Sequence, residues 1–92
     1  VSAVFACNFT NYLFSIAYDI CSENKIPFEI FFPLIRETIV KIEKNKPSKI
    51  QTGPGIRKDL NTIKKHLNFI KSKNSKKIYT ILTEGIIANN GK

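Results

Sequence analysis

Apolar residues recur at three- and four-residue intervals along most of this 92-residue chain, which is the spacing of one face of an α-helix. The pattern predicts four helices, at residues 3–23, 28–45, 59–71 and 76–88. No alternating strand pattern outweighs this helical one. We therefore predict an all-α fold, a helical bundle of about four helices that forms one domain over residues 1–92.

Two of these helices carry residues that affect their shape. Pro33 lies inside the second helix, and because proline lacks an N–H we expect it to bend that helix or to split it into a short turn and a longer rod. Asn74 or Ser75 is expected to cap the last helix. Gly85, near the apolar stripe of that helix, suggests a close contact with another helix.

One face of the first helix carries small polar side chains, and the helix has no Lys or Arg. The polar residues on this face are Asn8, Asn11, Ser15, Asp19 and Ser22. A face exposed to water usually carries Lys and Glu, whereas small uncharged groups suit a surface covered by a partner, a second domain or a ligand. We expect this helix to be largely covered; an Asn-rich face exposed to water is the alternative.

The loop from Thr52 to Asp59 is the most distinctive stretch of the chain. Gly53 and Gly55 tolerate unusual backbone angles and allow a ligand to approach the backbone, while Pro54 between them stiffens the bend. Asp59 precedes an apolar pattern of helical spacing and is therefore predicted to be the N-cap of the third helix.

The charges in this loop allow two interpretations. Arg57 and Lys58 beside a helix start favour an anionic oxygen, because N–H groups at a helix start and basic side chains both attract negative charge. Alternatively, the loop is an ordinary helix connection in which Arg57 pairs with Asp59 or with a nearby carbonyl. A dinucleotide-binding turn is excluded because Lys58 stands where G-x-G-x-x-G needs its third Gly, and the chain contains no P-loop motif.

His66 is the single histidine, and it shares a face of the third helix with Asp59 and Thr62. A lone helical histidine is either a structural residue or a proton donor and acceptor at a site, and the residues alone leave both open. One His and two Cys, without a C-x-x-C pattern, predict no metal site.

The net charge is +8, with 15 basic and 7 acidic residues, and the basic residues are concentrated after residue 40. Such a balance could favour a nucleic acid or another polyanion. Most of these lysines fall where a helix faces water, so we interpret them as a solvated surface and nucleic acid as a secondary candidate. The sequence contains no apolar run long enough to span a membrane, and we expect a cytoplasmic protein. Because the chain starts with Val1, we expect it to be part of a longer protein.

Three stretches of the chain resemble a known family. The segment Ala3-Val4-Phe5-Ala6-Cys7-Asn8-Phe9, the pair Pro33-Leu34, and Thr52-Gly53-Pro54 leading to Arg57, Asp59, Thr62 and His66-Leu67 carry the resemblance. The chain is similar over nearly all its length to the helical C-terminal domain, known as domain of unknown function 2520, of Rossmann-like NAD(P)-dependent oxidoreductases. That domain is similar in architecture to the C-terminal domain of 6-phosphogluconate dehydrogenase.

The resemblance implies a C-terminal substrate-binding and dimerisation domain. A Rossmann domain that lies N-terminal in such proteins, and is absent from this chain, would bind NAD(P), so this chain alone should bind no cofactor and be inactive. Asn8, Thr52, Gly53, Pro54, Arg57 and Asp59 would then form the binding site for a small anionic substrate. Arg57 would hold its anionic group, and Asp59 would cap the helix and fix Arg57. His66 would be catalytic and exchange a proton with a hydroxyl or carbonyl group. The expected partners are a second copy of the chain and the Rossmann domain.

This sequence departs from the family pattern at two places. Lys58 stands where the family commonly has Gly, and the His that commonly precedes the segment at Val1 is absent. The alternative function is a stand-alone basic helical module that binds nucleic acid or an acidic protein.

Overall fold

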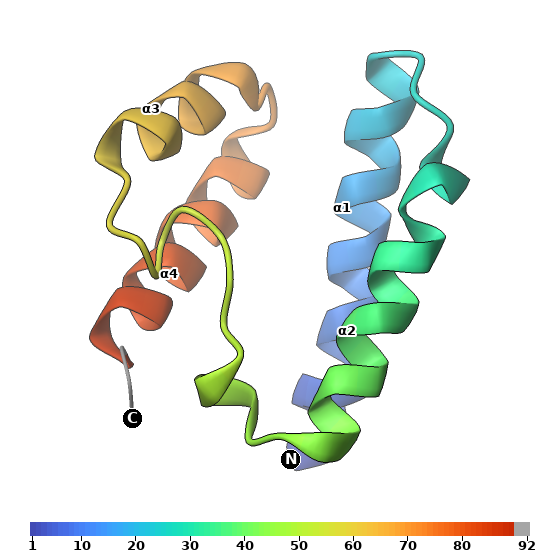
Figure 1. The fold of residues 1–92 in the computed structure, drawn as a ribbon. Helices are drawn as coiled ribbons and strands as arrows, with labels where there is room; N and C mark the ends of the chain where they lie inside the picture. Colours follow the sequence, from blue (N-terminus) through green and yellow to red (C-terminus); the bar gives the residue numbers. More distant parts are fainter. Residues whose placement is uncertain (90–92) are drawn as a thin grey trace. The chain divides into compact units, whose positions relative to one another are not determined.

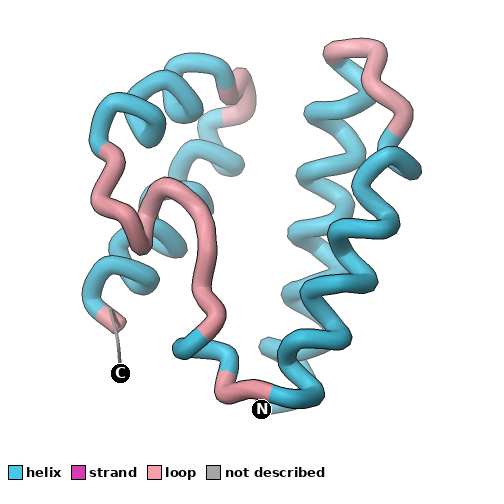
Figure 2. Tube along the Cα trace, in the orientation of Figure 1, coloured by secondary structure: helices cyan, strands magenta, loops and turns pink. Residues whose placement is uncertain are grey.

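The computed structural model describes residues 1–89, and all its regular structure is helical (Figures 1 and 2). The elements are the π-helix η1 (Val4–Phe9), α1 (Thr10–Glu23), the 3₁₀ turn η2 (Phe28–Phe31), α2 (Phe32–Lys44), the 3₁₀ turn η3 (Pro47–Lys49), α3 (Leu60–Phe69) and α4 (Lys73–Ala88). The all-α fold predicted from the apolar spacing is confirmed, and no strand occurs within residues 1–89.

The chain divides into two compact units, Val1–Ile35 and Arg36–Lys92. In the first unit, η1 continues directly into α1, so that the helix predicted over residues 3–23 is present but opens with a π-helical segment. The hydroxyl of Thr10 donates to the carbonyl oxygen of Phe5, five residues earlier, at 3.1 Å. Wider turns of this kind occur often at functional sites.

Helix α1 ends in a Schellman motif. The N–H of Ile26 donates to the carbonyl of Cys21 at 2.9 Å, and the N–H of Lys25 donates to that of Ser22 at 3.3 Å. Lys25 has φ 55°, in the left-handed region that this motif requires and that glycine most often occupies. The motif turns the chain sharply toward η2.

Aromatic rings join η2 to α1 in the first unit. Phe28 meets Tyr18 and Phe32 edge to face, with ring centroids 5.8 Å apart in both pairs. The second predicted helix is split at Phe32, as its proline suggested. Pro33 is the second residue of α2, where a missing N–H breaks no helical hydrogen bond.

The fourth helix starts earlier than its sequence suggested. Ser72 is its N-cap, and the Ser72 hydroxyl oxygen accepts a hydrogen bond from the N–H of Ser75 at 3.1 Å. The prediction that Asn74 or Ser75 caps this helix is therefore wrong: both lie inside its first turn. Ser72, Asn74 and Ser75 are all residue types that cap helices, and propensity alone could not choose among them.

Few side chains are fully buried. The buried apolar side chains within residues 1–89 are those of Cys21 and Ile70, whereas Leu60 is 70% exposed and Ile81 66% exposed. Gly85 is also exposed, and within the described part of the chain no atom lies within 4 Å of the position of an added Cβ, so the predicted close contact there is wrong. Among the described helices, none is long and apolar enough to cross a membrane.

Candidate functional site

The loop before α3 is an ordered turn built by backbone hydrogen bonds. The N–H of Asp59 donates to the carbonyl of Pro54 at 2.9 Å, and the N–H of Lys58 donates to that of Gly55 at 3.0 Å. Lys58 closes the turn with φ 53°, and Gly53 opens it with φ 100°. Both angles lie in the left-handed region that favours glycine. A glycine at position 58 would therefore suit the backbone that this chain adopts with lysine.

Asp59 caps α3, as predicted. Its carboxylate accepts a hydrogen bond from the N–H of Thr62 at 3.2 Å and another from the Thr62 hydroxyl at 2.7 Å. These two hydrogen bonds, assisted by the positive charges of Arg57 and Lys65, lower the pKa of Asp59 against the opposing effect of desolvation. The carboxylate is thus held ionised at the start of the helix, where the helix dipole also favours negative charge.

Arg57 extends from the turn beside this carboxylate. One guanidinium nitrogen lies 4.0 Å from Oδ2 of Asp59, and the Arg57 side chain is 60% exposed. The pairing with Asp59 was one of the two interpretations of this loop. At this distance and exposure it is a weak ion pair. The guanidinium therefore keeps donors available for another anion.

Gly55 packs against α4 and so connects the turn to that helix. It is buried, and a Cβ added to it would lie 3.3 Å from Cγ2 of Ile86 and 3.7 Å from Cγ2 of Thr83. Gly53, by contrast, has no atom of the described residues within 4 Å of the equivalent position. The turn is thus packed at one glycine and open at the other, which leaves space beside the backbone around Thr52 and Pro54.

His66 is exposed on α3, and its Nδ1 lies 2.8 Å from the hydroxyl oxygen of Tyr79 on α4. The two rings meet edge to face, with centroids 5.7 Å apart and planes at 90°. Sequence reasoning selected His66 but missed Tyr79, because the partner is thirteen residues away on another helix. Burial raises the pKa of Tyr79 above its ordinary value.

Asn8 belongs to the other unit. It lies in the π-helical segment η1 and is exposed, together with the neighbouring Phe5 and Phe9. The structure thus brings Thr52, Gly53, Pro54, Arg57 and Asp59 together in one turn and places His66 on the helix that this turn begins. The substrate-binding and catalytic roles of these residues and of Asn8 remain predictions.

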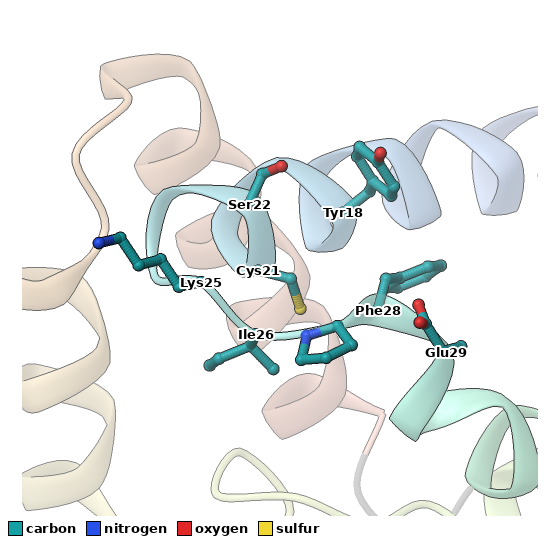
Figure 3. Close-up of a pocket in the computed structure, with 8 residues that line it drawn as sticks. Tyr18, Cys21, Ser22, Lys25, Ile26, Phe28 and Glu29 are labelled. Carbon is teal, nitrogen blue, oxygen red and sulfur yellow. The ribbon is translucent and has the colours of Figure 1, made fainter.

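The first unit contains a pocket that the sequence did not predict. It has a volume of about 300 Å³ and lies between the end of α1 and the segment leading into η2. Its lining residues are Tyr18, Cys21, Ser22, Lys25, Ile26, Pro27, Phe28 and Glu29. Figure 3 shows the Cys21 sulfur pointing toward the segment that carries Ile26, while Lys25 extends away from the sulfur. No cluster of three or more metal-ligating side chains occurs within residues 1–89.

Comparison with known proteins confirms the resemblance found in the sequence. The family model described as "Domain of unknown function (DUF2520)" matches residues 1–86. The crystal structure of a putative NADP oxidoreductase from Bacteroides fragilis is similar to this structure, with a TM-score of 0.89 and 36% sequence identity. The match covers 95% of this chain and 34% of that one, so the chain spans about a third of that protein. Comparison with curated proteins gives no match.

Proposed function

The chain belongs to the DUF2520 family, and we propose that it is the C-terminal substrate-binding and dimerisation domain of an NAD(P)-dependent oxidoreductase. The observation that carries this proposal is the similarity of nearly the whole chain to about a third of the structure described as a "putative NADP oxidoreductase". In this proposal an N-terminal Rossmann domain accounts for most of the remainder and binds the nicotinamide cofactor.

The residues of this chain do not fit a dinucleotide site of their own. The glycine turn has Lys58 where a dinucleotide-binding turn needs Gly, and within the described residues no strand precedes it. The cofactor, when bound to the other domain, would supply or accept the hydride. This chain would bind and orient the substrate that receives or gives it.

Arg57 is the residue that we propose binds an anionic group of the substrate. Two features support this role: the guanidinium is exposed, and the open side of Gly53 leaves room near the backbone. A planar guanidinium suits a carboxylate or phosphate because it can donate two parallel hydrogen bonds. Asp59 would act as a positioning residue, and His66 would contact the reacting oxygen.

Exposed apolar side chains support the dimerisation role. Phe5, Leu34, Leu60, Phe69 and Ile81 are each more than half exposed. Large apolar side chains are usually buried, so side chains exposed to this extent favour surfaces that other polypeptide covers. In this proposal a second copy of the chain and the Rossmann domain cover these residues.

Substitution of Arg57 tests the binding role. The intact protein would be assayed by NADPH oxidation with a panel of small carbonyl compounds, each of which carries a carboxylate or a phosphate group. Arg57→Ala should raise KM for the active compound by roughly tenfold to a hundredfold, because a hydrogen bond to a charged group contributes about 1.5–3 kcal/mol. Arg36→Ala is the matched control, since Arg36 is the other arginine of the chain and lies on α2. Equal kinetics for wild type and Arg57→Ala would remove Arg57 from the site.

A further inference from the structure

The contact between the His66 and Tyr79 side chains bears on which nitrogen of the imidazole carries the proton. Their 2.8 Å hydrogen bond uses Nδ1 of the imidazole, so Nε2 is the nitrogen on the other edge of the ring. The perpendicular ring contact, with centroids 5.7 Å apart, limits rotation of both rings. His66 is exposed, so its free edge is accessible to a small molecule.

We propose that Tyr79 is a positioning residue that donates its hydroxyl proton to Nδ1 and so fixes His66 in the Nε2–H tautomer. The free edge of neutral His66 is then a hydrogen-bond donor, and it selects a substrate oxygen that accepts, such as a carbonyl or carboxylate oxygen. The substrate contact rests on the function proposed above, whereas the tautomer is a property of this chain alone.

The direction of the hydrogen bond follows from the chemistry of the two groups. In a neutral imidazole one nitrogen donates and the other accepts, and the hydrogen bond made by one nitrogen sets the state of the other. A phenol O–H is more acidic than an imidazole N–H, and the unprotonated imidazole nitrogen is a stronger base than a phenol oxygen. The arrangement with O–H donating to Nδ1 is therefore favoured over the reverse.

The surroundings of Tyr79 keep its hydroxyl protonated. Tyr79 is partly buried on α4, and burial raises the pKa of its hydroxyl because the phenolate is poorly solvated there. The phenol thus keeps its proton at neutral pH. It has that proton to donate to the adjacent imidazole.

The tautomer can be measured directly. The intact protein would be labelled with ¹⁵N-histidine, and two-bond ¹H–¹⁵N spectra would be recorded in alkaline buffer in which the ring is neutral; the signals of His66 are those lost in His66→Gln. We expect an unprotonated Nδ1 and a protonated Nε2. Tyr79→Phe keeps the ring and loses the hydroxyl. In this variant the ratio of the Nε2–H to the Nδ1–H tautomer should fall roughly fivefold, because one ordinary hydrogen bond is lost.

Tyr18→Phe is the matched control, because it removes a hydroxyl from a tyrosine whose ring packs against Phe28 rather than His66, and it should leave the His66 spectrum unchanged. A protonated Nδ1 in the wild type, or the same tautomer ratio in Tyr79→Phe, would overturn the proposal, and the wild-type result does so even where a variant folds poorly. If the tautomer is as expected but the intact protein reduces none of the carbonyl compounds, the proposed function fails and the tautomer assignment stands. If His66→Gln lowers turnover but Nδ1 is protonated, the reverse holds.

Discussion

Gly55 lies against Ile86, close enough that a Cβ atom on the glycine would be 3.3 Å from Cγ2 of the isoleucine. This contact joins the turn that carries Arg57 to the second half of α4. We expect Gly55→Ala to destabilise the protein by about 1 kcal/mol, because Ile86 must move by a few tenths of an ångström in packed surroundings. Thermal unfolding of the intact protein measures the change, and an unchanged melting temperature would show that the turn and α4 are not tightly packed.

Gly85→Ala is expected to have the opposite effect. Gly85 is an exposed residue inside α4, and no atom of the described residues lies within 4 Å of its added Cβ. Alanine should therefore stabilise the helix by roughly 0.5–1 kcal/mol, since it loses less backbone entropy than glycine on folding. Destabilisation in the same unfolding measurement would indicate that a partner surface approaches α4 at this position.

Lys58→Gly should stabilise the turn by roughly 1 kcal/mol. Lys58 has φ 53°, a left-handed conformation that strains an L-residue with a side chain and leaves glycine unstrained. Lys58→Ala separates conformation from charge, because it removes the ammonium group and keeps the Cβ; it should melt near the wild type. The expectation is contradicted if alanine stabilises as much as glycine does.

Asp59 should make the stability of the protein depend on pH in the acid range. Its pKa is lowered in the folded chain by the two hydrogen bonds from Thr62 and by the nearby positive charges. A carboxyl whose folded pKa is depressed stabilises the fold fully above its unfolded pKa, which is about 3.9, and loses that contribution as pH falls through the folded value. Denaturant unfolding between neutral pH and pH about 3 should therefore show stability falling toward acid.

The matched variant for that measurement is Asp59→Asn. Asparagine still caps a helix but does not titrate, so the acid-dependent part of the loss should shrink while the cap remains. Asp59→Ala removes both the titrating carboxyl group and the helix cap, so it should lower the melting temperature further. An identical pH profile in wild type and Asp59→Asn would assign the acid sensitivity to other carboxyl groups.

Salt concentration separates self-association from polyanion binding. Dimerisation through exposed apolar side chains such as Leu60 and Phe69 should persist when salt is raised from 50 to 500 mM, because apolar burial is not screened. Binding to duplex DNA through the lysines should weaken steeply over the same range. Sedimentation of the intact protein and titration with DNA measure the two. A monomer at high protein concentration, or tight DNA binding with a steep salt slope, would favour the basic-module alternative.

The sequence by itself determined the helical class and the ends of several elements. The three- and four-residue apolar spacing predicted four helices, Pro33 predicted the division before α2, and Asp59 was identified as a cap. These features depend on interactions within a few residues of the chain. Local spacing, a missing N–H and a carboxylate beside a helix start are all visible in a linear sequence.

The tertiary structure decided which residues meet across elements. It chose Ser72 over its neighbours as a cap, placed the close glycine contact at Gly55 rather than Gly85, and supplied Tyr79 as the partner of His66. The physical reason is that such contacts depend on the distance between helices in space and on the rotation of each helix about its axis. Successive residues of an α-helix lie about 100° apart around its axis, so the rotation of the helix decides which of them faces a neighbouring helix. Sequence spacing could therefore identify the candidate side chains but not their partners.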